Sequence, residues 1–302
     1  MTSGTTADGP IGVLLMAHGT PDTIEDMPEY LMRVRDGRPP SPELIEEISH
    51  NYRAIGGRSP LTDLTLRQGA ALADLLGPGY AVAVGMRNWR PFIASAIDDL
   101  RARRVSRFIG LPLAPQFSTL SVQKYLEAAR SALTDAERFE CVRSFHDHPL
   151  LIDAFAERLR AAGPAIDEDV IFTAHSLPQR VIEAGDSYAR EVAATAAAVA
   201  ARAGLVRYRQ AWQSAGRTPE PWIGPDISEV IRQRAAAGAR TLLVAPIGFV
   251  CDHTEILFDL DVQASATAQA CGVALRRTQS LNTSPVFIRA LAALVRDMVR
   301  ES

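Results

Sequence analysis

Two stretches of the chain, IGVLLMAHGTP at residues 11–21 and VIFTAHSLP at residues 170–178, share one pattern. In each stretch an apolar run leads directly into Ala-His, two further residues and a proline. Short apolar runs that are bounded by glycine or proline are typical of buried strands. The repeated pattern therefore places one histidine, His18 or His175, directly after a strand in each half of the chain.

A second pair of matching stretches follows the first pair in the same order. LPLAPQF at residues 111–117 and LVAPIGF at residues 243–249 each predict an apolar strand that ends in Ala-Pro. Two matches in one order indicate a duplicated domain, and the amphipathic stretches between the apolar runs indicate an α/β fold with parallel sheets. Further strands are expected at 80–85, 108–114 and 241–246, and helices at 42–54, 64–76, 91–103, 121–133, 150–162, 186–203, 226–238 and 285–299.

The duplication also predicts the domain organisation. We expect an N-terminal half at residues 1–145 and a C-terminal half at residues 146–302, with the final helix at 285–300 packing back on the first half. Ligands of open α/β sheets bind at the carboxyl ends of the strands. Because all four repeated elements fall at such ends, we expect them to face one cleft between the halves.

Length and composition limit the classes of function. The 302 residues suit about two domains, and the net charge of −3 excludes a strongly basic nucleic-acid-binding protein. Lys124 is the only lysine, so an anion site in this chain must use arginine. Residues 1–10 lack the features of a signal peptide, and no apolar run reaches the ~18–20 residues of a membrane span. We therefore expect a cytoplasmic protein with no transmembrane segment.

The three cysteines, Cys141, Cys251 and Cys271, lie far apart in the sequence. Their number and spacing do not fit a disulfide framework, a structural zinc site or an iron–sulfur site. The chain also lacks a glycine-rich dinucleotide motif, a phosphate-binding loop with lysine, and a Gly-x-Ser-x-Gly nucleophile motif.

An acidic stretch, GFVCDHTEILFDLD at residues 248–261, interrupts one of the most apolar parts of the chain. A helix that begins near Asp252 would place Asp252, Glu255 and Asp259 on one face. Such a ladder of carboxylates can conduct a divalent cation or carry protons. The alternative is a solvated acidic face on which Asp252 caps the helix and Glu255 stands at its third position. For His175 the alternative is a cap or a purely structural contact.

Several long motifs resemble the signature segments of ferrochelatases. They are AHSLP (174–178), WQSAGRTPEPWIGPD (212–226) and the acidic stretch at 248–261, together with YRAIGGRSPL (52–61) and LAPQFSTLSVQKY (113–125). The resemblance extends over roughly residues 11–300. It implies two similar Rossmann-like, chelatase-type domains around a central cleft, and an enzyme of haem biosynthesis that inserts Fe²⁺ into a porphyrin.

The resemblance also implies roles for individual residues. His175 and Glu255 match the family's catalytic, iron-binding pair, and Asp252 and Asp259 would support them as an acidic ladder. The form of residues 212–226 is closer to the soluble branch that uses coproporphyrin III. A protoporphyrin IX ferrochelatase, a cobalt or nickel chelatase of another tetrapyrrole, and a haem carrier without catalysis are the alternatives.

Porphyrin contacts are implied in the first half of the chain. The positions concerned are His18, Arg35, Asn51, Tyr52, Ser59 and Tyr125, and the arginines at 33, 35, 38, 53 and 58 are candidate partners for the four propionates of coproporphyrin III. Two positions depart from the pattern. His18 stands where the soluble branch commonly has tyrosine and is a candidate axial ligand, and Asn51 stands where relatives often have arginine.

The resemblance sets expectations for cofactors and partners as well. Fe²⁺ and coproporphyrin III would be substrates, with no permanently bound cofactor. Three scattered cysteines cannot supply the four ligands of the 2Fe–2S cluster that some relatives carry. A monomer is expected, with no nucleic-acid partner and with transient contact to the next enzyme of the haem pathway.

Overall fold

The structure is a computed structural model, and it describes residues 9–165, 168–216 and 218–301. Within these residues the strands form two separate four-stranded sheets, ordered β2-β1-β3-β4 and β6-β5-β7-β8, in which every pairing is parallel. This architecture confirms the predicted α/β class. The strands are β1 (Ile11–Ala17), β2 (Tyr80–Met86), β3 (Arg107–Pro112), β4 (Arg138–Cys141), β5 (Asp169–His175), β6 (Arg209–Gln213), β7 (Thr241–Pro246) and β8 (Ala274–Arg277).

The two sheets repeat one topology. The strand that ends in Ala-His is central in each, since β1 lies between β2 and β3 and β5 lies between β6 and β7. The registers also correspond, because Met16 pairs with Pro112 and Thr173 pairs with Pro246. The sequence alignment of the second repeat was therefore wrong by three residues. Leu-Pro at 111–112 is the counterpart of Ala-Pro at 245–246, and Ala-Pro at 114–115 lies beyond the end of β3.

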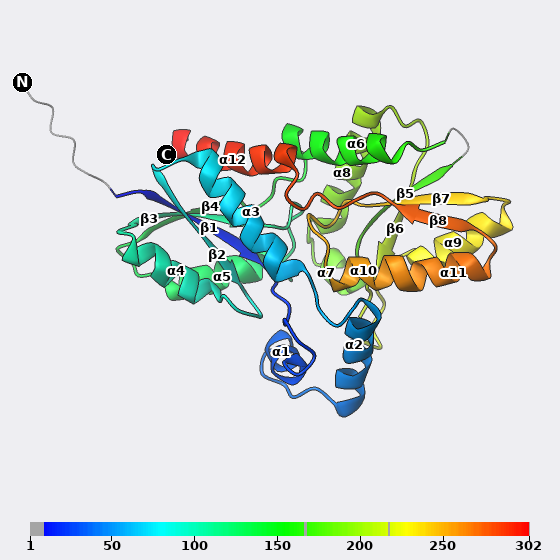
Figure 1. The fold of residues 1–302 in the computed structure, drawn as a ribbon, viewed down its shortest axis with the longest axis horizontal. Coiled ribbons are helices and arrows are strands. Elements are labelled where there is room, and N and C mark those ends of the chain that lie inside the picture. Colours follow the sequence, from blue (N-terminus) through cyan, green and yellow to red (C-terminus); the bar gives the residue numbers. More distant parts are fainter. Residues whose placement is uncertain (1–8, 166–167, 217, 302) are drawn as a thin grey trace, which may run out of the picture.

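Helices alternate with the strands along the chain (Figure 1). Most helices fall where the apolar periodicity places them, while α1, α7, η1 and α11 are additional to the expected set. The helices are α1 (Met27–Val34), α2 (Pro42–Ala54), α3 (Leu61–Leu76), α4 (Ile93–Ala102), α5 (Val122–Ala132), α6 (Pro149–Ala162), α7 (Gln179–Glu183), α8 (Tyr188–Ala203), α9 (Ile227–Ala236), α10 (Thr254–Leu257), the π-helix η1 (Asp259–Ala264), α11 (Ser265–Ala270) and α12 (Pro285–Arg300).

The last helix, α12, joins the two halves. It packs against α3 and β3 of the first half and against α6, and Figure 1 shows α12 and α6 next to each other in one row at the top of the view. The Arg296 guanidinium donates to the carbonyl of Leu75 at 2.9 Å, and Arg107 donates to the carbonyl of Met298 at 3.4 Å. A single apolar cluster beneath this helix contains buried residues of both sheets. The halves are therefore packed into one body.

A small lobe of α1 and α2 projects from the first half below the two sheets (Figure 1). Helix α2 begins at Pro42 after Ser41, whose hydroxyl caps it by accepting from the backbone N–H of Leu44 at 3.3 Å. Met27, Leu31 and Tyr52 form the buried centre of the lobe. Four of the positions expected to contact a porphyrin, at 35, 51, 52 and 59, lie in or beside this lobe.

Among the described residues, no helix is both long and apolar enough to cross a membrane. Residues 1–8, on which most of the expectation about a leader rests, lie outside the described part of the chain.

Candidate functional site

His175 is the last residue of the central strand β5. The next residue, Ser176, is fixed by its backbone N–H, which donates to the carbonyl of Gln213 at 2.7 Å, and by its hydroxyl, which donates to Ile223 at 2.7 Å. The Nδ1–H of His175 donates to the carbonyl of Ser176. This contact assigns the proton of a neutral ring to Nδ1 and leaves the lone pair of Nε2 free.

A close approach of two strand ends determines where His175 sits. A Cβ atom on Gly248, just after β7, would lie only 2.5 Å from the Cβ of Ala174. Glycine is therefore required here for β5 and β7 to pack this closely. The backbone N–H of Gly248 donates to the carbonyl of Thr173 at 3.1 Å, which extends the sheet pairing up to the site.

Glu255 lies opposite His175, on the short helix α10. Its Oε2 is 3.7 Å from Nε2 of His175, and its side chain is 38% exposed. The amide of Gln213, at the end of β6, donates to the backbone carbonyl of Glu255 at 2.7 Å. The structure thus brings together the two residues that the sequence singled out, and it shows that Gln213 supports both of their segments.

A second imidazole, that of His253, faces the same carboxylate oxygen. Its Nε2 lies 3.6 Å from Oε2 of Glu255, and its Nδ1–H donates to the carbonyl of Cys251 at 3.0 Å. The sequence reasoning did not assign His253 a role, although it stands inside the quoted acidic stretch. Its position two residues before Glu255 was the available signal. Two imidazole nitrogens therefore point at one carboxylate oxygen.

The electrostatics of this group favour an ionised carboxylate. Burial raises the pKa of Glu255, but the positive charges of His175 and His253 in their protonated forms, with the hydrogen bond from His253, outweigh burial and lower the pKa to about 2. Burial lowers the pKa of His253, but the neighbouring carboxylate of Glu255 outweighs burial, so the pKa of His253 is raised above its usual value. At neutral pH Glu255 therefore carries a negative charge between two imidazoles.

Asp259 stands at the first position of η1, where its carboxylate interacts electrostatically with Glu255. The hydroxyl of Ser214 donates to its carboxylate. Burial, followed by the charge of Glu255, raises the pKa of Asp259 to about 6. A carboxyl group that titrates near neutral pH is suited to accept and release protons.

Asp252 does not belong to this ladder. The helix was predicted to begin near Asp252, but it begins at Thr254 with His253 at the N-cap, so both the three-carboxylate face and the capping alternative were wrong. The Asp252 carboxylate instead accepts from Ser280 at 2.7 Å and from Asn282 at 2.9 Å. The chain turns before α10, and this turn directs Asp252 to these residues.

The first half contributes His18, which follows β1 as predicted. Its Nε2 lies 3.1 Å from the hydroxyl of Tyr30, and the amide of Asn88 lies 3.2 Å from the ring nitrogens. Burial lowers the pKa of His18 to about 4, and the ring interacts electrostatically with Glu255 and His175. A neutral imidazole from the first half therefore faces the same site as the pair from the second half.

The expected porphyrin-contacting residues differ in exposure. Arg35 and Asn51 are half-buried, and Nε of Arg35 is buried without a hydrogen-bond partner. Tyr52, Ser59 and Tyr125 are buried, so they offer little surface to a ligand in this conformation. Of these five side chains, Arg35 is thus the one with a buried donor atom that lacks a partner.

Three of the arginines proposed for propionates already have acidic partners. Arg33 pairs with Glu29 at 2.9 Å. Arg53 pairs with Glu46 at 2.7 Å, and Arg58 pairs with Asp63 at 3.1 Å. A further cation, Arg87 at the end of β2, was not selected from the sequence; it pairs with Asp36 at 3.0 Å and is 20% exposed.

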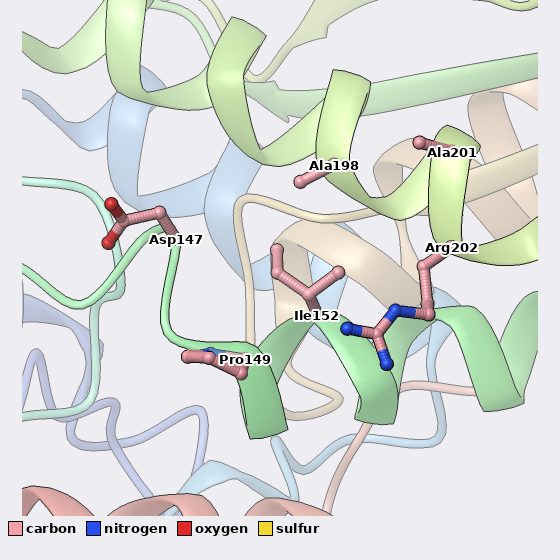
Figure 2. A pocket seen from close by; sticks show the side chains of 6 residues that line it. All are labelled: Asp147, Pro149, Ile152, Ala198, Ala201 and Arg202. Atoms are coloured by element: carbon pink, nitrogen blue, oxygen red, sulfur yellow. The ribbon is translucent and has the colours of Figure 1, made fainter.

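Two hollows help to locate the site. One of about 440 Å³ is lined by Arg87 and Asn88 together with residues of the α1 region, and it adjoins His18 through Asn88. The other, of about 470 Å³, lies between α6 and α8 and is drawn in Figure 2. Asp147 and Arg202 are its charged residues, and it lacks the histidine and carboxylate pair described above.

The His and Glu side chains of this group do not surround a common point in the way that ligands surround a bound metal ion. Among the described residues, no group of three or more His, Cys, Asp or Glu side chains is placed to hold a metal ion. Bonds of about 2.1 Å from a divalent metal to nitrogen and oxygen span up to about 4.2 Å between two ligands. The 3.7 Å between His175 and Glu255 lies within that span. The pair can therefore hold a cation transiently while leaving coordination positions for another ligand.

Comparison with protein families gives one match over nearly the whole chain. The model of the family Ferrochelatase matches residues 10–299. The "Ferrochelatase" of Deinococcus radiodurans is 41% identical over 300 residues, which cover 95% of this chain and 95% of that protein. The "Coproporphyrin III ferrochelatase" of Geobacillus sp. (strain WCH70) is 36% identical over 302 residues, which cover 94% of this chain and 96% of that protein.

Solved structures with a similar fold include chelatases. SirB from Bacillus subtilis with Fe³⁺ matches with a TM-score of 0.59 and 12% identity, covering 95% of both chains. CbiX, described as the terminal enzyme of sirohaem biosynthesis in denitrifying bacteria, matches with a TM-score of 0.51 and 16% identity, covering 95% of this chain and 98% of that one. At these identities the likeness concerns the fold alone.

Proposed function

The chain belongs to the ferrochelatase family, enzymes that insert a metal into a porphyrin in haem biosynthesis, and from this premise we propose that it inserts Fe²⁺ into coproporphyrin III. The observation that carries the proposed chemistry is the approach of Nε2 of His175 and Nε2 of His253 to one oxygen of Glu255, at 3.7 and 3.6 Å. Metal insertion needs a place where Fe²⁺ loses part of its water shell, and bases that accept two pyrrole protons.

Glu255 is proposed to receive the iron. Its carboxylate is ionised at neutral pH because its pKa is lowered to about 2, so it presents a fixed negative charge to an approaching Fe²⁺. Nε2 of His175 is available as the second ligand or as a base, because Nδ1 carries the proton that is donated to Ser176. An ion held by only two side chains can be passed on to four pyrrole nitrogens.

The protons displaced from the pyrroles are proposed to leave through the same group. His175 accepts a proton at Nε2, 3.7 Å from the carboxylate of Glu255, whose negative charge stabilises the imidazolium. Asp259, whose pKa is raised to about 6, is then able to take a proton near neutral pH and to release it. Ser214 holds this carboxylate by donating to it.

His18 is proposed to face the iron of the product from the opposite side. Burial lowers its pKa to about 4, so the ring is neutral at physiological pH and its nitrogen is able to bind a metal. The hydroxyl of Tyr30, 3.1 Å from Nε2, holds the ring until a ligand takes its place.

Coproporphyrin III is favoured as the substrate by two observations. Relatives from Geobacillus sp. (strain WCH70) and Halalkalibacterium halodurans, 36% and 35% identical, are both named coproporphyrin III ferrochelatases. The hollow of about 440 Å³ is also lined by Arg33 and Arg87, which would exchange Glu29 and Asp36 for propionates, and Arg35, whose Nε is buried without a partner, lies in the same region of the chain. Coproporphyrin III has four propionates where protoporphyrin IX has two, so guanidinium groups discriminate between them.

The test is anaerobic metal insertion with Fe²⁺ and each porphyrin, followed by absorption spectroscopy. The expected result is a kcat/KM at least about tenfold higher with coproporphyrin III, since one charge-assisted hydrogen bond is worth that factor or more. Equal values, or a higher value with protoporphyrin IX, would contradict the proposed specificity. Co²⁺ and Ni²⁺ in the same assay measure the preference for the metal.

Other expectations accompany this proposal as predictions. They are action in the cytoplasm as a monomer, transient contact with the enzyme that takes the product, and the absence of a 2Fe–2S cluster. The positions of the cysteines concern the expected absence of a 2Fe–2S cluster. Cys141, Cys251 and Cys271 lie on β4, before α10 and after α11, and none forms a disulfide.

A further inference from the structure

Arg277, on the last strand β8, reaches two carboxylates of the segment that carries Glu255. Its Nη2 lies 3.2 Å from Oδ1 of Asp252, just before α10. Its Nε and Nη2 donate to the two oxygens of Asp261, in η1, at 2.6 and 2.9 Å. The Arg277 side chain is 17% exposed. One guanidinium therefore ties the turn before Glu255 to the helix after it.

The two ends of this tie are held differently. Asp252 has further donors, because Ser280 and Asn282 bind its oxygens at 2.7 and 2.9 Å, and its own backbone N–H donates to Asn282 at 2.9 Å. Asp261 accepts from Arg277 through both of its oxygens and is 41% exposed. The position of Asp252 is thus fixed by several donors. Arg277 links η1 to this fixed position through Asp261.

The segment needs such support because its helix is of an uncommon kind. The backbone N–H of Gln263 donates to the carbonyl of Phe258 at 2.9 Å, five residues back, as in a π-helix. Short π-helical stretches are rare and frequently occur at functional sites. Asp259 opens this stretch, and Glu255 precedes it by one turn of α10. The register of η1 therefore sets the position of Asp259 relative to Glu255.

We propose that Arg277 is a positioning residue for metal insertion, which holds Glu255 and Asp259 toward His175 by clamping Asp252 and Asp261 together. Arg277 acts through the segment, because its contacts are with Asp252, Asp261 and the carbonyl of Thr278 rather than with the proposed iron ligands. The inference rests on the proposed role of Glu255 and not on which porphyrin is the substrate.

The neighbouring residue on the same strand supplies a matched control. Successive side chains of a strand point to opposite faces, so Arg276 lies on the other face of β8 from Arg277. There Arg276 donates to Glu168 from Nε at 2.8 Å and to the carbonyl of Gly163 at 3.1 Å. It makes the same kind of clamp with no contact to the segment that carries Glu255.

The experiment compares Arg277→Met with Arg276→Met in steady-state iron insertion, using whichever porphyrin the parent turns over faster. Both variants are expected to unfold at lower urea concentration. Arg277→Met alone is expected to raise the KM for Fe²⁺ or to lower kcat by about tenfold or more, since small misplacements of reacting groups have effects of this size. Its Kd for the porphyrin should stay within about twofold of the parent value.

Conservative replacement separates positioning from stability. Arg277→Lys is expected to recover only part of the iron kinetics, because one ammonium group cannot bind two carboxylates as a guanidinium does. If the iron kinetics of Arg277→Met match those of the parent, or if Arg276→Met changes them equally, Arg277 has no positioning role.

A milder variant covers the case in which Arg277→Met does not fold. Asp261→Asn removes the charge of a 41% exposed partner and leaves Arg277 with Asp252. It is expected to raise the KM for Fe²⁺ by about threefold, and an unchanged value would overturn the proposal. Glu255→Gln is assayed beside it. If that variant keeps parental activity, the assigned role of Glu255 fails independently of the Arg277 result.

Discussion

Nε2 of His175 lies 3.7 Å from Oε2 of Glu255, although the two residues come from the end of β5 and from α10. This distance is too long for a direct hydrogen bond and short enough for one cation to contact both atoms. The Nδ1–H of His175 is committed to the carbonyl of Ser176, so the lone pair of Nε2 faces the carboxylate. The geometry of the pair is therefore compatible with the proposed contact to a metal ion or a transferred proton.

Removing the charge of Glu255 tests this relationship. Glu255→Gln keeps the shape of the side chain and its backbone bond to Gln213, but it loses the charge that attracts Fe²⁺. We expect iron insertion to fall by about 100-fold or more, with the Kd for the porphyrin nearly unchanged. Stopped-flow insertion and fluorescence quenching of the porphyrin measure the two quantities.

Glu229→Gln is the matched control for that variant. Glu229 is exposed on α9 and accepts a hydrogen bond from Gln233 at 3.0 Å. This contact lies outside the group formed by His175, His253 and Glu255. This control should insert iron at the parental rate. If Glu255→Gln does so as well, the acidic group has no part in metallation.

His18 has a spectroscopic prediction. If it ligates the product iron, its replacement by alanine removes a neutral nitrogen from the axial position of the haem. The product complex of His18→Ala should therefore show a shifted Soret band, while His18→Tyr should give a third spectrum. Identical spectra for the parent and His18→Ala would exclude ligation by this residue.

A buried carboxylate, Asp186, holds a segment of the first half against the second. Its Oδ2 accepts from the backbone N–H and the hydroxyl of Thr119, both at 2.7 Å, and from the hydroxyl of Ser118 at 3.2 Å. Its Oδ1 accepts from the N–H of Tyr188 at 2.9 Å. Because an amide cannot accept all four bonds, Asp186→Asn should lower the free energy of unfolding by about 2 kcal/mol.

Urea denaturation measures this loss, and Asp74→Asn is its control. Asp74 is exposed on α3, so its change should stay within about 0.5 kcal/mol of the parent. An equal effect of the two substitutions would show that Asp186 does not hold the halves together.

The free energy of unfolding should decrease at low pH because of Glu137, in the first half of the chain. Two hydrogen bonds from Arg101, each of 2.7 Å, lower the pKa of Glu137 to about 2 in the folded protein, and the side chain is 12% exposed. The folded pKa lies below the unfolded one, so the stabilisation is complete above about pH 4.5 and is lost as the pH falls toward 2. Its size is at most about 3 kcal/mol.

Urea denaturation of the parent and of Glu137→Gln over this pH range checks the direction in which the free energy of unfolding changes with pH. The difference in free energy of unfolding should be largest near neutral pH and should shrink as the solution is acidified. A difference that grows toward low pH, or that is constant, would mean that the ion pair does not set the acid stability.

The sequence predicted the elements whose burial is nearly complete. Residues of β1 and β5 are buried in an almost unbroken run, which produces the apolar stretches from which these strands were predicted. Strands β4, β6 and β8 were missed because they begin with exposed arginine or alanine and bury only part of their length. Strands that are only partly buried give a weaker apolar signal than central ones.

The candidate site was predicted in part for a similar reason. His175 follows a buried strand and Glu255 interrupts an apolar stretch, so both were visible as exceptions to a pattern. The direction of Asp252 was not visible, since it depends on Ser280 and Asn282, which lie beyond β8 and meet Asp252 only in the folded chain. The role of His253 likewise depends on its Nδ1 contact with Cys251, which fixes the ring only in the folded chain.

The most direct test of the account is the rate of Fe²⁺ insertion by His175→Ala under anaerobic conditions, measured in a single turnover with porphyrin already bound. Loss of Nε2 removes the partner 3.7 Å from Glu255, so we predict that haem formation becomes undetectable while the porphyrin still binds with a Kd close to that of the parent. Haem formation at the parental rate would contradict the assignment of the His175 and Glu255 pair as the site of metal insertion.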